Sequence, residues 1–369
     1  MKILLLGEYS NVHATLACGL RELGHQVTVA SDGDGWKNYP RDIDLRRRSL
    51  GHKDTWQFLC RLIHNLPRFK GYDVVQLINP VFLPLKAEAH KFFYTYLRKH
   101  NRSLFMGAFG VDHYYVKTCL DCKTFRYSDF NFGSLLRKTP ETEIWKRDWL
   151  FGAKGRWNQW VARDCDGIIA GLYEYYASYN CHYPQKLKFI PFPLCPGKPV
   201  GHKRKADDPV RFFIGVQRSR NAYKGTDVML RALMRTKERF PHECEIVKVE
   251  SVPFSEYVKL MHGSDVLLDQ LYSYTPAMNA LEAMSNGLVV VGGGEPENYE
   301  ILGEHELHPI INVLPDEESV YNSLCRIVEK RSALPELARQ SQLYIERHHS
   351  YLKVAQKYLD FWNTVQNIK

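Results

Sequence analysis

Three basic residues stand close together in the second half of the chain, where Arg218, Arg220 and Lys224 lie in one short polar segment after Val216. Such a cluster suits a negatively charged ligand, above all a diphosphate. Fixed cations also stabilise the charge that gathers on a departing diphosphate, because they favour the transition state over the ground state. Solvated charges on an exposed loop are the alternative interpretation of these residues.

A second segment whose residues could bind a ligand runs from Thr275 to Glu282. Thr275 is suited to cap a helix and Pro276 to occupy its first turn, which puts Met278 and Asn279 at the helix start. The N–H groups and the dipole at a helix N-terminus attract phosphate. Glu282 lies further along this largely apolar helix, where a hydrogen bond to a ribose and simple exposure to water are the two alternatives.

A glycine run follows the next apolar segment, residues 288–291. Gly292, Gly293 and Gly294 have no Cβ atoms, so a ligand can come close to the backbone there. Glu295 is the next residue and places a carboxylate beside this glycine run.

The elements that position these residues begin with a strand–helix–strand unit. Residues 2–6 form a continuous apolar run, typical of a strand buried on both faces, and Gly7 ends it. The next segment has apolar residues at helical spacing, namely Val12, Leu16, Leu20 and Leu23. Gly24 is placed to end this helix, and residues 26–30 form the next strand.

A similar unit appears after residue 209. Residues 211–216 resemble a strand, Gly225 opens a helix, and residues 245–249 form the next strand. Residues 265–271 and 288–291 are further strands of the same sheet. We therefore predict an α/β chain with two Rossmann-like, doubly wound parallel-sheet domains that face a cleft and hold ligands at the carboxyl ends of their strands.

The domain boundaries follow from a proline-rich linker between residues 191 and 208. We predict an N-terminal domain over residues 1–195 and a C-terminal domain over residues 209–345. Residues 337–362 have a helical pattern with an aromatic apolar stripe that needs a partner. Residues 346–369 are therefore expected to form a last helix that packs on the first domain.

Length, composition and net charge indicate what type of protein this chain is. The chain has 369 residues, 44% of them hydrophobic and 25% charged, which is typical of a globular protein. The apolar start is too short for a signal peptide and no apolar run could span a bilayer, so we expect a cytoplasmic protein. Nine scattered cysteines suit reduced thiols. The net charge of +9 favours acidic partners, but no module for nucleic acid accompanies it.

Several familiar sites are missing. Neither strand–helix unit carries Gly-x-Gly-x-x-Gly or a Walker-type loop, which counts against dinucleotide and P-loop enzymes. Cys119 and Cys122 have metal-ligand spacing but no second pair, so no metal is expected. Asp32-Gly-Asp34 matches a metal-binding triplet that arises often by chance. The basic clusters at residues 46–48, 98–100 and 203–205 are either solvated loops or a weak membrane-surface patch.

Two segments in combination resemble the donor half of the GT-B glycosyltransferases of family 4. They are G-V-Q-R-S-R-N-A-Y-K-G from Gly215 to Gly225 and A-L-E-A-M-S-N-G-L-V-V-V from Ala280 to Val291. The resemblance is clearest over residues 210–300 and fainter over residues 1–31. It implies transfer from a UDP- or GDP-sugar with retention of configuration, usually without a metal or an enzyme nucleophile.

The resemblance implies that the domain over residues 1–195 binds the acceptor and that the domain over residues 209–345 binds the nucleotide sugar. It also implies roles for particular residues. Lys224 and a nearby arginine would bind the donor diphosphate, Glu282 the ribose, and Gly7 would lie near the phosphates or the acceptor. The family arginine commonly lies five positions before the lysine, where this chain has Ser219. Of the two flanking arginines we favour Arg218, with Arg220 as the alternative.

A second departure concerns the donor sugar. The family glutamate that contacts this sugar stands eight positions before Glu282, and Tyr274 occupies that position here. Glu295 is the candidate to replace it. Tyr274, Thr275, Met278, Asn279 and Gly294 complete the expected nucleotide-sugar site.

The first half offers two further catalytic candidates beside Lys224. Asp112 and His113 follow the strand expected at residues 103–106 and are placed to contact the donor sugar or an acceptor hydroxyl. A loop pair that is satisfied internally is the alternative. The next stretch, residues 114–160, is rich in aromatic and basic residues, which suits sugar stacking, a membrane interface, or two helices packed on the sheet.

The sequence thus predicts a metal-independent glycosyltransferase that acts on a saccharide or lipid-linked acceptor, in cell-surface polysaccharide or glycolipid synthesis. The nucleotide sugar is a co-substrate and no other cofactor is expected. We expect the protein to lie in the cytoplasm and to contact the inner face of the membrane. A sugar-nucleotide epimerase of the same fold and a non-catalytic sugar-nucleotide- or glycan-binding protein are the alternatives, the latter motivated by Tyr274.

Overall fold

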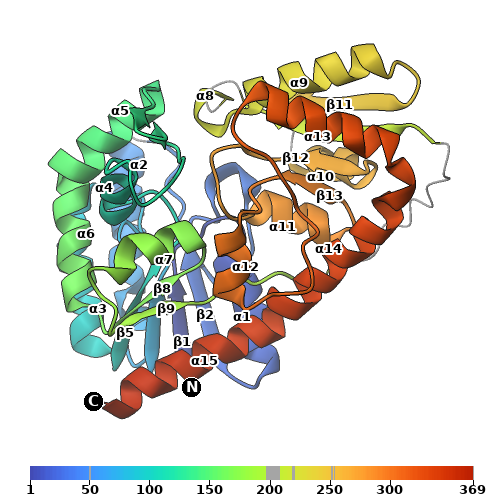
Figure 1. The fold of residues 1–369 in the computed structure, drawn as a ribbon. Helices are drawn as coiled ribbons and strands as arrows, with labels where there is room; N and C mark the ends of the chain where they lie inside the picture. Colours follow the sequence, from blue (N-terminus) through green and yellow to red (C-terminus); the bar gives the residue numbers. More distant parts are fainter. Residues whose placement is uncertain (50, 197–207, 218–220, 251, 253, 369) are drawn as a thin grey trace. The chain divides into compact units, whose positions relative to one another are not determined.

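The computed structural model describes residues 1–49, 51–196, 208–217, 221–250, 252 and 254–368 (Figure 1). The chain divides into two compact units. Unit 1 comprises residues 1–117, 144–193 and 351–369, and unit 2 comprises residues 118–143 and 194–350.

Unit 1 is built on a seven-stranded sheet with the order β3-β2-β1-β4-β5-β8-β9, in which every neighbouring pair is parallel. The strands are β1 (Lys2–Leu6), β2 (Gln26–Ser31), β3 (Ile43–Asp44), β4 (Val74–Leu77), β5 (Ser103–Ala108), β8 (Gly167–Ala170) and β9 (Leu187–Phe189). The apolar run of β1 is buried from Ile3 to Leu6, as expected for a central strand covered on both faces.

The helices of this half of the chain follow the strands in turn. They are α1 (Val12–Glu22), α2 (His52–Asn65), α3 (His90–His100), α4 (His113–Cys119), α5 (Pro140–Lys146), a π-helical turn (Arg147–Phe151), α6 (Ala153–Asp164) and α7 (Tyr173–Asn180). Gly24 ends the first of them with a φ of 82°, as its position after the apolar stripe predicts.

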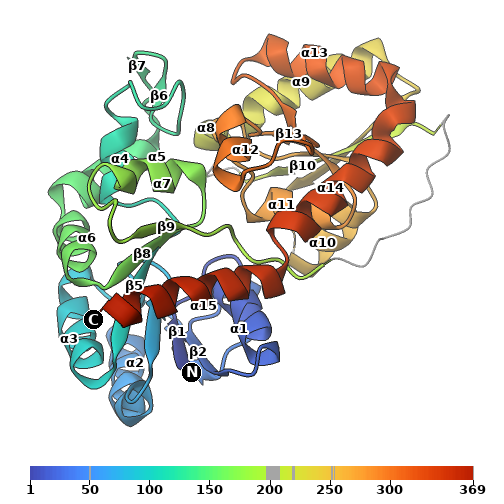
Figure 2. The same cartoon turned by 60° about the horizontal axis from the view of Figure 1, so that its bottom comes forward.

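The last helix, α15 (Tyr351–Ile368), packs on unit 1 along α1 (Figure 2). Its Trp362 is fully buried and meets Phe105 of β5 with ring centroids 6.1 Å apart. Gln366 Nε2 donates a hydrogen bond of 2.8 Å to the carbonyl of Asp73. The predicted return of the C-terminal helix to the first domain is confirmed.

The tail is not one continuous helix, however. It forms α14 (Leu334–His348) in unit 2 and α15 in unit 1, with a break at His349 and Ser350. The amide of Leu194 donates to the carbonyl of His349 at 2.7 Å and so takes up a carbonyl that a continuous helix would use internally. This contact also lies where the chain enters unit 2, at residue 194.

Unit 2 has a five-stranded parallel sheet with the order β11-β10-β12-β13-β14. Its strands are β10 (Val210–Val216), β11 (Cys244–Glu250), β12 (Val266–Leu268), β13 (Val289–Gly292) and β14 (Ile311–Asn312). Its helices besides α14 are α8 (Asn221–Lys224), α9 (Thr226–Arg239), α10 (Phe254–His262), α11 (Met278–Ser285), α12 (Pro296–Leu302) and α13 (Glu317–Glu329).

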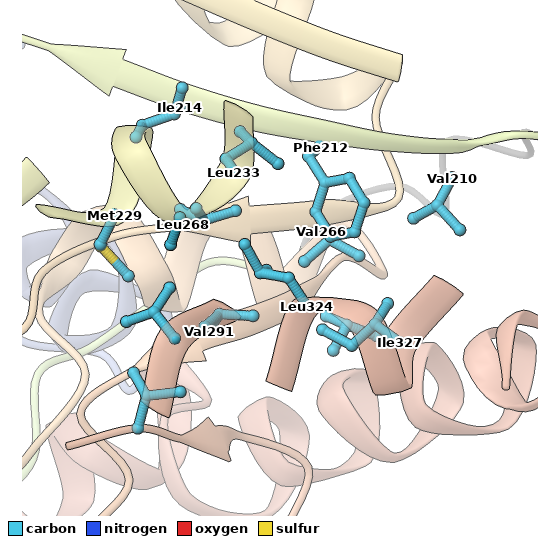
Figure 3. Packing of buried hydrophobic residues seen from close by; sticks show 14 of the residues in the cluster. Val210, Phe212, Ile214, Met229, Leu233, Val266, Leu268, Val291, Leu324 and Ile327 are labelled. Carbon is cyan, nitrogen blue, oxygen red and sulfur yellow. The ribbon is translucent and has the colours of Figure 1, made fainter. Parts of the chain in front are cut away.

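The core of unit 2 explains why its strands read as continuous apolar runs. Val210, Phe212 and Ile214 of β10 pack on one face of the sheet against Leu233 of α9 and Leu324 of α13 (Figure 3). On β10, Phe213 lies between these positions and packs against Tyr257 of α10, with ring centroids 5.0 Å apart. Because helices cover both faces, every position of the strand is apolar apart from Arg211 and Gly215.

The predicted domain boundaries need one revision. Residues Thr118–Glu143 belong to unit 2, although they lie inside the range predicted for the first domain. We call this segment the arm. It contains a short antiparallel hairpin, β6 (Asn131–Phe132) and β7 (Leu135–Leu136), and buries Phe125, Tyr127 and Phe130. Exposing these aromatic side chains to water would cost free energy, which favours the association of the arm with unit 2.

The packing of α15 on α1 leads to a first prediction. A Cβ atom on Gly19 would lie 2.6 Å from the carbonyl oxygen of Tyr351 and 2.9 Å from Ala355 Cβ. We expect Gly19→Leu to push the two helices apart and to lower the free energy of unfolding of unit 1 by roughly 1–3 kcal/mol, measured by urea unfolding. Cys18→Leu adds the same side chain at an exposed neighbour and is the control. Equal stability of the two variants would contradict this packing.

Candidate functional site

Lys224 lies at a topological switch point of the unit 2 sheet. Strands β10 and β12 are neighbours although β11 lies between them in sequence, and ligands of open α/β sheets bind outside the carboxyl ends of such strands. The chain leaving β10 reaches Lys224 at the end of α8. The amide of Leu271, in the loop after β12, donates to the Lys224 carbonyl at 2.9 Å. Arg218 and Arg220 lie outside the described residues.

A buried carboxylate accompanies this lysine. Asp269 follows β12 directly and accepts a hydrogen bond of 2.8 Å from Asn279 Nδ2, while Tyr257 donates to Asn279 Oδ1 at 2.9 Å. Burial raises the pKa of Asp269, and the positive charge of Lys224 and the Asn279 hydrogen bond oppose that rise. Asp269 is not among the site residues predicted from the sequence, although it is an acidic residue at the carboxyl end of an apolar run.

Helix α11 begins later than predicted. Ala277 is its N-cap residue and Met278 its first residue, so the prediction that Thr275 caps the helix and Pro276 opens it is wrong. Thr275 is buried instead, and its carbonyl accepts a hydrogen bond of 2.5 Å from Ser273 Oγ. No side chain caps the start of α11, where Met278 and Asn279 lie, so no cap residue takes up the first backbone N–H groups of this helix. Such groups can bind an anion.

Glu282 lies one turn further along α11 and is half-buried. Its Oε1 accepts a weak hydrogen bond of 3.3 Å from Asn286 Nδ2. Its assignment to a ribose stays a prediction.

The glycine run after β13 allows two loops to pack closely. A Cβ atom on Gly293 would lie 2.3 Å from the carbonyl oxygen of Ser273. A Cβ on Gly294 would lie 2.7 Å from Ile310 Cγ2, and the Gly294 amide donates to Asn312 Oδ1 at 3.1 Å. The space that these glycines leave open is thus occupied by other parts of the chain, at Ser273 and Ile310. The sequence predicts a ligand in this space.

Tyr274 is covered by the arm. Its side chain is 1% exposed, and its hydroxyl accepts a hydrogen bond of 2.6 Å from the amide of Arg126. The rings of Phe125 and Tyr127 lie 5.6 and 5.1 Å from that of Tyr274. Burial raises the pKa of Tyr274 to about 12, so its phenol is neutral. The residue in the position of the family glutamate therefore anchors the arm.

Glu295 is the acceptor at the centre of a network between the arm and the loop after β13. One of its oxygens accepts hydrogen bonds from the hydroxyl of Tyr127 and from Asn312 Nδ2, the latter at 2.9 Å. The other accepts from the Arg126 guanidinium at 2.8 Å. The same guanidinium donates to both oxygens of Glu297, at 2.6 and 2.9 Å. Burial acts to raise the pKa of Glu297, but the hydrogen bond from Arg126 outweighs it and the pKa falls below its ordinary value.

A second arginine ties the arm to the loop that carries Lys224. The guanidinium carbon of Arg137 lies 3.1 Å from the ring centroid of Tyr272, and its nitrogens donate to the carbonyls of Ala222 at 2.8 Å and Tyr223 at 3.3 Å. The arm therefore contacts the loops after β10, β12 and β13. These loops form the carboxyl edge of unit 2, so the arm is part of the candidate site.

The candidates of unit 1 have internal partners. Asp112 is fully buried, and its two carboxylate oxygens accept hydrogen bonds from the amide of Tyr115 at 3.0 Å and the hydroxyl of Tyr179 at 2.7 Å. His113 Nδ1 donates to the carbonyl of Trp149 at 2.9 Å. Burial lowers the pKa of His113, so its ring is neutral at pH 7. These hydrogen bonds hold both residues near the start of α4, and their catalytic roles stay predictions.

Gly7 ends β1 in a conformation that requires glycine. Its φ is 87°, and a Cβ atom there would lie 2.3 Å from Ile78 Cγ2, just after β4. In unit 1, β1 and β4 are neighbours separated in sequence by β2 and β3, so Gly7 too lies at a switch point.

The described residues contain no group of three or more His, Cys, Asp or Glu side chains placed to hold a metal ion. In the same part of the chain, none of the helices is long and apolar enough to cross a membrane.

Comparison with solved structures identifies the fold. Sucrose-phosphate synthase from Thermosynechococcus elongatus aligns over 100% of both chains with 12% identity and a TM-score of 0.61. HepE from Anabaena, in complex with UDP and glucose, aligns over 99% of this chain and 100% of its own with 13% identity and a TM-score of 0.61. UDP-GlcNAc 2-epimerase from Neisseria meningitidis, bound to UDP-GlcNAc, has 10% identity and a TM-score of 0.54 over 98% and 99% of the two chains.

These similarities confirm the predicted GT-B fold. No family model matches the sequence, and no curated protein matches it significantly.

The network around Glu295 leads to a second prediction. Tyr127→Phe keeps the buried ring but removes one donor to a buried carboxylate, which should lower the free energy of unfolding by roughly 1–3 kcal/mol. We expect arm peptides to exchange their amide hydrogens faster in this variant. Tyr176→Phe, whose ring packs on Phe189, is the control. Unchanged exchange in the arm of Tyr127→Phe would show that the hydroxyl does not hold it.

Asp112 gives a prediction with a defined pH dependence. Burial raises its pKa to about 6, although hydrogen bonds from Tyr115 and Tyr179 oppose the rise. The folded state therefore takes up a proton between the unfolded pKa of about 4 and pH 6, and stability falls as pH rises through that window. We expect Asp112→Asn to flatten this part of the stability profile, measured by urea unfolding from pH 4 to 7. A profile as steep as that of the unmodified chain would contradict the assignment.

Proposed function

We propose that the chain is a glycosyltransferase that moves a sugar from a UDP- or GDP-sugar to a saccharide or lipid-linked acceptor with retention of configuration. The observation that carries the proposal is the group of Lys224, Asp269 and the start of α11 at the switch point of unit 2. The GT-B fold supports it, since HepE of the same fold is described with UDP and with UDP-glucose.

In this proposal Lys224 binds the donor diphosphate. As the bond between sugar and phosphate breaks, negative charge grows on the diphosphate, and a fixed ammonium group stabilises that growing charge. Asp269 lies close by, and the positive charge of Lys224 opposes the rise that burial causes in the pKa of Asp269. Amide groups at the start of α11 hydrogen-bond the phosphates, and Glu282 accepts a hydrogen bond from the ribose.

The fixed cation and the helix start supply the charge stabilisation that a metal ion supplies in other transferases, so we propose a metal-independent reaction. The nucleotide sugar is then a co-substrate and no further cofactor takes part. The diphosphate oxygen freed by bond cleavage takes the proton of the acceptor hydroxyl. Asp112 and His113 are proposed to orient the acceptor or the donor sugar, and Gly7 is proposed to lie near the phosphates or the acceptor.

The acceptor is proposed to belong to a cell-surface polysaccharide or a glycolipid, and the enzyme to work in the cytoplasm at the inner face of the membrane. The high net charge of +9 supports an anionic surface as a neighbour.

A sugar-nucleotide epimerase is the second candidate, favoured by the similarity to a UDP-GlcNAc 2-epimerase. A non-catalytic sugar-nucleotide- or glycan-binding protein is the third, favoured by the burial of Tyr274 under the arm. Product analysis by NMR separates them: a transferase forms a new glycosidic bond only with acceptor present, an epimerase inverts a carbon of the donor without one, and a binding protein does neither.

The role of Lys224 gives a direct test. We expect Lys224→Ala to lower kcat/KM for transfer by about a hundredfold or more, because a charge that acts mainly in the transition state is removed. The melting temperature should not change. Lys259→Ala, at an exposed position of α10 in the same unit, is the matched control and should keep full activity. Transfer by Lys224→Ala at the rate of this control would refute the assignment.

A further inference from the structure

Helix α2 of unit 1 exposes an apolar stripe. Trp56, Leu59 and Ile63 are 68%, 37% and 62% exposed. Because an α-helix turns about 100° per residue, these three positions lie within roughly 60° of one another. Phe58 and Leu62 on the other side of the helix are buried and hold it to the unit. The exposed stripe therefore has no role in the core of unit 1.

The surroundings of this stripe are strongly basic. Between Leu45 and Tyr72 the chain has seven lysines and arginines and a single acidic residue, Asp54. This segment holds most of the excess positive charge of the protein, whose net charge is +9. Asp54 accepts a hydrogen bond from Ser49, so even this carboxylate is engaged locally.

Hydrogen bonds join the basic loop before α2 to the helix itself. A guanidinium nitrogen of Arg61 donates to the carbonyl of Arg46, and one of Arg47 donates to Thr55 Oγ1. These bonds hold the basic loop to the helix. Lys53, one turn before Trp56 on α2, and Arg48, in the loop, both have exposed side chains. Figure 2 shows α2 on the outside of unit 1.

We propose that α2 and residues 46–48 bind the surface of an anionic lipid bilayer. Tryptophan and large aliphatic side chains on one side of a helix, with lysine and arginine beside them, are what an interfacial helix needs. The indole of Trp56 suits the boundary between headgroups and acyl chains. Each nearby cation adds attraction to anionic headgroups.

This inference goes beyond the proposed function and does not depend on it, because bilayer binding requires neither donor nor turnover. It also gives a location to the membrane contact proposed above. The helix would lie in the interface, since at 14 residues it is too short to span a bilayer.

Vesicle co-sedimentation tests the proposal with the full chain. Vesicles of phosphatidylcholine with about one third phosphatidylglycerol should bind the protein, and pure phosphatidylcholine vesicles should bind it much more weakly. Trp56→Ser/Ile63→Ser should raise the apparent Kd at least about tenfold, because the buried apolar area is lost. Arg48→Ala/Lys53→Ala should raise it by about tenfold and reduce its dependence on salt.

The matched control is Leu314→Ser, which removes a leucine that is 54% exposed on unit 2 and should leave binding unchanged. Quenching of Trp56 by brominated lipid, measured as the signal lost in Trp56→Phe, distinguishes insertion from adsorption. Failure of the unmodified chain to bind anionic vesicles would overturn the proposal. So would binding by Trp56→Ser/Ile63→Ser at the affinity of the Leu314→Ser control.

Discussion

A parallel sheet brings the carboxyl ends of its strands to one edge, and the candidate site of unit 2 depends on this constraint. The order β11-β10-β12-β13-β14 makes β10 and β12 neighbours, so the segments that follow these two strands lie next to each other. The hydrogen bond between Leu271 and the Lys224 carbonyl joins these segments, and Asp269 lies close to the lysine. A cation, a carboxylate and a helix start thus come together from segments that are far apart in sequence.

The arm adds a second constraint at the same edge. Glu295 is a buried carboxylate, and a buried charge is tolerated only when donors satisfy it. Two of its donors, Arg126 and Tyr127, come from the arm. This requirement ties residues 118–143 to unit 2, although the flanking residues belong to unit 1. Tyr274 joins the same interaction, so an aromatic residue stands where the resembled family has a sugar-binding glutamate.

Much of the fold could be predicted from the sequence because buried parallel strands are continuous apolar runs. The strands at residues 2–6 and 211–216 and the helix that ends at Gly24 follow directly from apolar pattern and glycine position. The start of α11 was misplaced because Thr275 and Pro276 have capping chemistry, whereas tertiary packing buries Thr275 in the loop before the helix. The arm could not be predicted, since the partners of Arg126 and Tyr127 lie 148 and 168 residues further along the chain. The pattern of residues within a short segment of sequence does not predict contacts over such distances along the chain.

We propose that the carboxyl edge of unit 2 binds a nucleoside diphosphate. Hydrogen–deuterium exchange of the full chain with and without UDP, and separately GDP, can test this proposal. We expect slower exchange in peptides that contain Lys224 and in those that span residues 269–282, with one of the two nucleotides. Protection confined to peptides of unit 1, or no protection with either nucleotide at saturating concentration, would contradict this proposal.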